Sequence, residues 1–162
     1  MNRSSEEMSP LVDKVISGGQ SGVDRGALDA ARWLGIEHGG WCPRGRRSED
    51  GPIPHLYQLR ETNQADYSVR TERNVVEADG TLILYRGELS GGTELTRRLA
   101  LRHQRPLLLM DLDEPLEPGD LRAWITDHGV RVLNVAGPRE SSCPGITDEA
   151  RRMVIGALSD GI

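Results

Sequence analysis

Short apolar runs alternate along the chain with longer segments in which apolar residues recur every three or four positions. The runs are rich in Val, Ile and Leu and predict strands, whereas the longer segments have the spacing of amphipathic helices. The predicted strands are 12–16, 36–41, 81–85, 106–111 and 130–135. The predicted helices are 23–34, 65–78, 93–103, 121–128 and 147–158.

Strands that alternate with helices of this length need crossover connections, which make the strands parallel and place helices on both faces of the sheet. The pattern therefore predicts an α/β fold, a Rossmann-like three-layer α/β/α arrangement with a mainly parallel sheet of about five or more strands. The unbroken leucine run at 106–111 predicts a strand buried on both faces. Thr147 is expected to cap the last helix.

One long stretch, 42–62, has no sustained periodicity and is rich in Pro, Gly, Arg and acidic residues. A stretch of that length without regular structure inside a small domain is either functional or disordered. Trp41, Ile53, Leu56, Tyr57 and Leu59 give it apolar anchors. We therefore expect 42–62 to be an ordered flap beside a ligand site.

The 162 residues suit a single domain, predicted at 11–162 after a disordered tail at 1–10. A net charge of -5 argues against nucleic-acid binding, which normally needs a basic face. The 2 cysteines lack CxxC spacing, as expected in a reducing cytoplasm. Since no apolar run approaches the roughly 20 residues of a membrane span, we expect neither membrane insertion nor export.

Three glycine-containing loops, 17–25, 89–93 and 134–141, each follow a predicted strand. Such loops present free backbone N–H groups and helix N-termini, and in a doubly wound sheet the carboxyl ends of the strands open into one crevice. Together they predict a cradle for phosphate or another oxyanion. The first loop matches neither GxGxxG nor the Walker pattern, which disfavours a dinucleotide or ATPase site.

The candidate ligand-binding residues are the glycines and polar residues of these loops and two flap arginines. They are Gly18, Gly19, Gln20, Ser21, Gly22, Arg44, Arg46, Ser90, Gly91, Gly92, Thr93, Gly137, Arg139 and Ser141. Arginine is favoured because its planar fork matches phosphate, and Trp41 adds an aromatic face for a heterocycle. The alternatives are an ordinary tight turn for the first loop, helix capping for Thr93, an ion pair with Glu140 or another nearby acid for Arg139 and a solvated surface for the flap arginines.

Several other polar residues have two interpretations. Asp24 and Arg25 either cap their helix and pair with each other or face the ligand, and the structural role is slightly favoured. Arg70 and Asn74 share a helix face and could point into the crevice, although a solvated face is the more common outcome. His38 and Cys42 are four residues apart but outside any helix, so no metal site and no structural metal are expected.

Six ordered motifs carry a resemblance to a known family. They are 18–24, 38–43, 49–54, 59–62, 90–93 and 133–141. On these motifs the chain resembles the bacterial molybdenum carrier family, within the Rossmann-like superfamily that also holds the lysine-decarboxylase-like cytokinin-activating enzymes and the DNA-processing protein DprA. The resemblance implies that a phosphate-bearing pterin or nucleotide binds at the glycine loops of a homodimer or tetramer.

Two functions follow as hypotheses. The first is a non-catalytic carrier or sensor that holds molybdenum cofactor (molybdopterin) or a nucleotide and delivers it to a cofactor-accepting enzyme. The alternative is a nucleotide N-glycosidase of the phosphoribohydrolase type, with Glu61 or Glu140 as its carboxylate. In the cytokinin-activating relatives the catalytic glutamate follows the motif threonine by three residues, a position that Thr96 holds here, and this disfavours the enzyme. A third, weaker hypothesis is a protein-interaction module.

Overall fold

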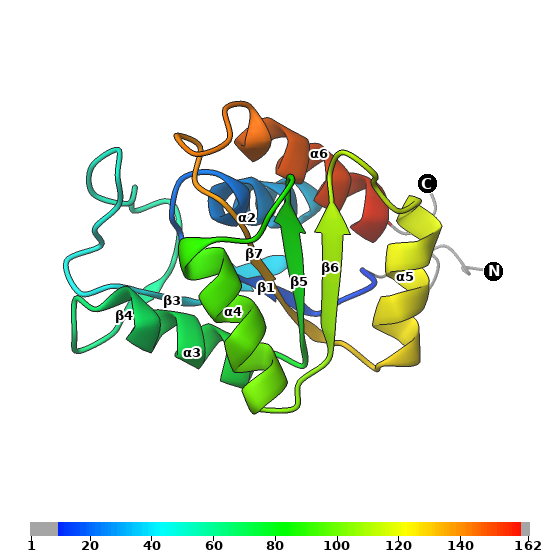
Figure 1. Ribbon diagram of the computed structural model, residues 1–162, viewed down its shortest axis with the longest axis horizontal. Helices are drawn as coiled ribbons and strands as arrows, with labels where there is room; N and C mark the ends of the chain where they lie inside the picture. The colour runs from blue at the N-terminus through cyan, green and yellow to red at the C-terminus, as the bar shows by residue number, and fades with distance from the viewer. Residues whose placement is uncertain (1–9, 160–162) are drawn as a thin grey trace.

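The computed structural model describes residues 10–159 (Figure 1). The predicted tail at 1–10 lies outside the described residues except for Pro10, and the predicted domain boundaries stay a prediction. Five parallel strands form the central sheet in the order β2-β1-β7-β5-β6. They are β1 (Lys14–Ile16), β2 (Glu37–Gly39), β5 (Gly80–Tyr85), β6 (Leu107–Asp111) and β7 (Val132–Ala136).

Helices cover both faces of this sheet, as the alternating pattern predicts (Figure 1). On one face lie α2 (Val23–Leu34), α5 (Pro118–Asp127) and α6 (Ile146–Leu158), which share the main apolar core with β1, β5 and β7. On the other face α3 (Tyr67–Glu77) and α4 (Gly91–Arg102) pack around a smaller cluster. The predicted three-layer α/β/α arrangement is therefore confirmed.

The strand order reveals how the chain is wound. If β7 and α6 are counted first, followed by β1, β2, β5 and β6, the spatial order becomes 3-2-1-4-5, that of a doubly wound dinucleotide-type sheet. The chain thus runs through a familiar sheet from a different starting point. The order reverses between β7 and β5, and ligands of such sheets bind outside the carboxyl ends of the strands at that switch point.

The second predicted strand, 36–41, is interrupted by Gly40. Gly40 has a φ of 124° and lies so close to Ser17 that a Cβ atom would overlap the Ser17 carbonyl oxygen. The chain leaves the main sheet there, and β3 (Trp41–Cys42) pairs instead with β4 (Arg60–Glu61) in a two-stranded parallel sheet. The flap is therefore anchored at both ends, by β3 and β4.

Two further sequence predictions are corrected. β6 is an edge strand, and Leu109 is 37% exposed, so the leucine run is not buried on both faces. Helix α6 is capped by Gly145 rather than Thr147, because the Thr147 hydroxyl donates to Glu140 Oε1 at 2.7 Å. Within residues 10–159 no helix is long and apolar enough to cross a bilayer.

Candidate functional site

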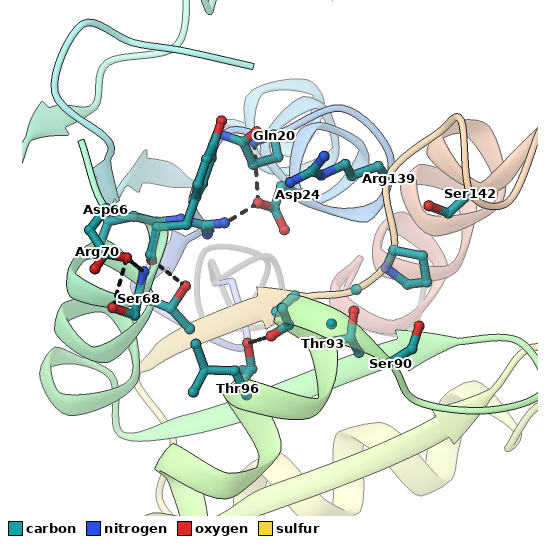
Figure 2. Close-up of a pocket in the computed structure, with 18 residues that line it drawn as sticks. Gln20, Asp24, Asp66, Ser68, Arg70, Ser90, Thr93, Thr96, Arg139 and Ser142 are labelled. Carbon is teal, nitrogen blue, oxygen red and sulfur yellow. Dashed lines mark hydrogen bonds and ion pairs between the residues drawn. The ribbon is translucent and has the colours of Figure 1, made fainter. Parts of the chain in front are cut away.

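A cavity of about 450 Å³ opens at the switch point between β5 and β7 (Figure 2). Four segments line it: the start of α2 with the loop before it, the start of α3, the start of α4, and the loop that follows β7. Of the predicted ligand-binding residues, seven line this cavity. They are Gln20, Ser90, Gly91, Gly92, Thr93, Gly137 and Arg139.

The second glycine loop leads directly into helix α4. Ser90 is its N-cap in extended conformation, and the Ser90 hydroxyl does not cap the helix. The N–H groups of Gly91 and Gly92 have no acceptor within the described part of the chain, as expected for a helix start. A Cβ atom on either glycine would have no neighbouring atom within 4 Å. The second loop therefore presents unpaired donors at an exposed helix start that lines the cavity.

The glycines of the first loop are packed instead. A Cβ atom would overlap Arg70 at Gly18, Leu59 at Gly19, and the Pro138 carbonyl oxygen at Gly22. Gly19 and Gly22 also have positive φ angles, of 78° and 89°. Close packing within the chain accounts for these three glycines, and none of them lines the cavity.

A buried ion pair joins the first loop to helix α3. Arg70 Nη1 lies 3.7 Å from Asp24 Oδ2, and the two side chains are 14% and 5% exposed. Burial raises the pKa of the Asp24 carboxyl above its ordinary value, although the nearby Arg70 opposes this. Asp24 pairs with Arg70 rather than with Arg25, which donates to Asp50 Oδ2 at 2.5 Å.

Two arginines and one tyrosine form the polar end of the cavity. The guanidinium carbons of Arg70 and Arg139 lie 5.7 and 5.6 Å from the centroid of the Tyr67 ring. Neither guanidinium donates a hydrogen bond to any of residues 10–159, and Arg70 Nε is buried without a partner. Arg139 is not paired with Glu140, whose carboxylate accepts from Gly145 N at 2.6 Å.

The flap is held by its acidic residues. Glu49 accepts hydrogen bonds from the hydroxyls of Ser21 and Ser141 and from Ser141 N, and these bonds lower the pKa of the Glu49 carboxyl. Arg25 binds Asp50 and lowers the pKa of that carboxyl to about 2. Ser21 and Ser141 thus contact the flap and do not line the cavity.

The structure places the flap arginines and Trp41 away from the cavity. Arg46 donates to the carbonyl oxygens of Ile53, Pro54 and Tyr57 and so holds the flap's own backbone, while Arg44 is exposed. The Trp41 indole N–H donates to Glu77, and its ring lies against Arg60 and Arg73. These residues therefore serve the flap and its anchoring strands.

Sequence reasoning gave too little weight to four residues that line the cavity, namely Asp24, Tyr67, Arg70 and Thr96. Arg70 and Asn74 do share a buried helix face. The Asn74 side-chain amide accepts a hydrogen bond from Trp41 N and donates one to Trp41 O. The spacing of these two residues was the available signal. No group of three or more possible metal-ligating side chains comes together among the described residues.

Comparisons with known proteins agree with this architecture. Residues 15–158 match the family described as "Circularly permutated YpsA SLOG family", whose name fits the strand order counted from β7. The crystal structure of "Putative molybdenum carrier protein" from Syntrophus aciditrophicus SB has 43% identity and a TM-score of 0.88, over 92% of this chain and 96% of that chain. The resemblance to molybdenum carriers is thereby confirmed.

(E)-4-Hydroxy-3-methyl-but-2-enyl diphosphate reductase matches with a TM-score of 0.40 and 15% identity, over 91% of this chain and 60% of that chain, which is too remote to carry an inference. No curated protein gives a significant match to the sequence. The family match and the 43% identity suffice: the chain belongs to the circularly permutated YpsA SLOG family.

Proposed function

We propose that the protein binds a phosphate-bearing heterocycle in the switch-point cavity and acts as a carrier or sensor for it. The ligand is molybdenum cofactor, as the name of the similar Syntrophus protein suggests, or a nucleotide. In this proposal the protein works as a homodimer or tetramer and passes its cargo to an accepting enzyme. The molybdenum is part of the cargo.

The observation that carries the proposal is the Arg70 guanidinium. It is largely buried, it lies beyond hydrogen-bond distance of Asp24, and it donates no hydrogen bond within residues 10–159. Leaving a buried donor unpaired costs about 1–3 kcal/mol, and more for a charged group. An anionic ligand would accept hydrogen bonds from this group. Arg139, which also lies beside Tyr67, would add a second guanidinium that can donate two parallel hydrogen bonds.

The start of α4 supplies the other half of an anion site. The N–H groups of Gly91 and Gly92 have no acceptor within residues 10–159, and the positive end of the helix dipole favours a phosphate there. The Tyr67 ring, which lies within 6 Å of both guanidinium groups, adds an aromatic side chain to the cavity wall, the kind of group that Trp41 was expected to supply. The cavity thus offers contacts for both parts of the ligand.

The N-glycosidase alternative loses its named carboxylates. Glu61 accepts from Gly45 N, Glu140 accepts from Gly145 N, and neither lines the cavity. Thr96 does line the cavity, and its hydroxyl donates to Gly92 O at 2.8 Å. Of the carboxylates that do line the cavity, Asp24 is paired with Arg70 and Asp66 caps helix α3, so binding without hydrolysis is the function that we favour.

A thermal-shift series tests the proposal. Nucleoside monophosphates, inorganic pyrophosphate and a pterin phosphate are added to the protein and to two variants, Arg70→Gln and Arg73→Gln. Both arginines lie on α3, but Arg73 is exposed and does not line the cavity. A ligand that binds only the folded state raises the melting temperature, so we expect shifts for the unchanged protein and Arg73→Gln and none for Arg70→Gln.

Two results would count against the proposal. Equal shifts in both variants would separate ligand binding from Arg70. Release of free base from a nucleoside monophosphate in the same samples would favour the N-glycosidase function over the carrier function.

A further inference from the structure

We propose that Gln20 and Asp24 form a hydrogen-bond-accepting subsite in the same cavity, which selects ligands carrying a pair of adjacent N–H or O–H donors. This inference rests on the proposed function and names the group that the ligand needs besides its phosphate. Figure 2 shows Gln20 and Asp24 on one side of the cavity and Ser90 and Thr93 on the opposite side. The two sides differ in chemistry.

The Gln20 side chain ends in an acceptor without a partner. Gln20 is 3% exposed, and its Oε1 atom accepts no hydrogen bond from the described residues. Its Nε2 atom donates to Arg47 O at 2.9 Å, and because only the nitrogen can donate, this bond fixes which end of the amide is the oxygen. An unpaired buried acceptor carries a desolvation cost that a ligand donor would remove.

The Asp24 carboxylate is similarly short of donors. Its Oδ2 atom accepts from Gln20 N at 3.2 Å, and Arg70 Nη1 stands 3.7 Å away, too far for a hydrogen bond. An ionised carboxylate has about four lone-pair sites, and a buried one needs most of them filled. Burial raises the pKa of the Asp24 carboxyl, although Arg70, Gln20 N and the Ser17 hydroxyl oppose this.

The opposite side of the cavity offers donors. There the free N–H groups of Gly91 and Gly92 begin helix α4. Arg70 and Arg139 add unpaired guanidinium donors beside Tyr67, on the same side of the cavity as Asp24 (Figure 2). An inorganic anion would satisfy these groups but would leave Asp24 and Gln20 Oε1 as they are. A ligand that satisfies both sides combines an anion with a donor pair.

Two parts of a nucleotide or pterin present such a donor pair to a carboxylate. One is the vicinal diol of a ribose, and the other is the ring N–H with the neighbouring exocyclic amine of a 2-amino-4-oxo heterocycle, which guanine and pterin share. Both donate two adjacent hydrogens, so one subsite can recognise either. The experiment distinguishes the two sources.

Calorimetric titration with GMP, 2′,3′-dideoxy-GMP, IMP and inorganic pyrophosphate separates these possibilities. We expect GMP to bind at least about tenfold more tightly than one of its two analogues, the ratio typical of one hydrogen bond to a charged group. A loss with dideoxy-GMP assigns the diol, and a loss with IMP assigns the amine edge. In Asp24→Asn the tenfold preference should fall to near unity, while pyrophosphate binding remains.

Two further variants control for poor folding of Asp24→Asn and for the loss of a carboxylate elsewhere in the protein. Gln20→Met removes the orphan acceptor without touching the ion pair, and it should reduce the same preference even if Asp24→Asn folds poorly. Asp50→Asn removes a carboxylate outside the cavity and should leave the preference unchanged. Equal affinity of GMP and both analogues for the unchanged protein would overturn the subsite while leaving the proposed function intact. Failure of every probe, pyrophosphate included, would overturn both.

Discussion

The first and second glycine loops look alike in sequence but differ in what their glycines are for. In the first loop the missing side chains make room for the protein itself, for Arg70 at Gly18 and for the backbone of Pro138 at Gly22. In the second loop nothing lies within 4 Å of the position of a Cβ atom on Gly91 or Gly92. A glycine-rich loop therefore indicates that another group comes close to its backbone. Only the structure tells whether that group belongs to the protein or to a ligand.

The largest expected effect on folding stability comes from Gly22→Ala. Alanine at φ 89° is strained, and its Cβ atom would overlap the Pro138 carbonyl oxygen, so we expect the free energy of unfolding to fall by about 2–5 kcal/mol. Urea denaturation measures this. Gly87→Ala is the control, because Gly87 has a φ of 77° but no neighbour within 4 Å. Equal losses in the two variants would show that packing is not what Gly22 serves.

Arg70→Gln should be the next most damaging change. It removes the partner of a buried carboxylate at the first loop, a loss of about 3 kcal/mol in the free energy of unfolding. The double variant Asp24→Asn with Arg70→Gln should recover part of that loss, because no uncompensated charge remains. Urea denaturation of both single variants and the double variant gives the coupling. Strictly additive losses would mean that the two side chains do not form a pair.

A smaller effect is expected where the flap is tied to the first loop. Arg25 holds the pKa of Asp50 near 2, below the ordinary 3.8, so the pair stabilises the flap above about pH 3.8 and this stabilisation is lost as the pH falls toward 2. Because Asp50 is half exposed, we expect only about 0.5 kcal/mol.

Hydrogen exchange of residues 42–62 in Asp50→Asn measures this contribution. The variant should exchange faster than the unchanged protein at pH 7, and the difference between them should vanish near pH 2, after correction for intrinsic exchange rates. Asp148→Asn, which removes an ion-pair partner of Arg151 on α6, is the control and should leave the flap unaffected. A flap that exchanges equally in all three proteins at pH 7 would contradict a stabilising role for the ion pair between Arg25 and Asp50.

Some features of this fold could be predicted from the sequence and others could not. Apolar periodicity located each of the main-sheet strands and helices, because each depends on its own residues and on burial of one face. The break at Gly40 depends on Ser17, which approaches from a distant part of the chain. The edge position of β6 depends on strand order, which the pattern of single strands does not encode.

The candidate site divides in the same way. The glycine loops were recognisable because strand ends and helix starts are local features, and residues 90–93 do line the cavity. Other contacts of the site join segments far apart in sequence. They are the ion pair between Asp24 and Arg70, the hydrogen bond that Ser21 donates to Glu49, and the contact of Tyr67 with Arg70. A single sequence contains no signal for such contacts beyond the residue types themselves.

The second loop gives the smallest expected effect on stability and the largest on binding. Gly92→Ala places a methyl group where no atom beyond its own helix backbone and chain neighbours lies within 4 Å, so the free energy of unfolding should change by less than about 1 kcal/mol. Because Gly92 lines the cavity, the same methyl group would take up space that the proposed ligand needs beside the start of α4. Binding should therefore be lost from a protein that is folded normally.

Native mass spectrometry of the unchanged protein and Gly92→Ala, both purified anaerobically, tests the central claim most directly. The account predicts that the unchanged protein retains a phosphorus-containing pterin or nucleotide, identified after denaturation, and that Gly92→Ala does not. A ligand retained equally by both proteins would contradict the claim that the second glycine loop forms the anion site.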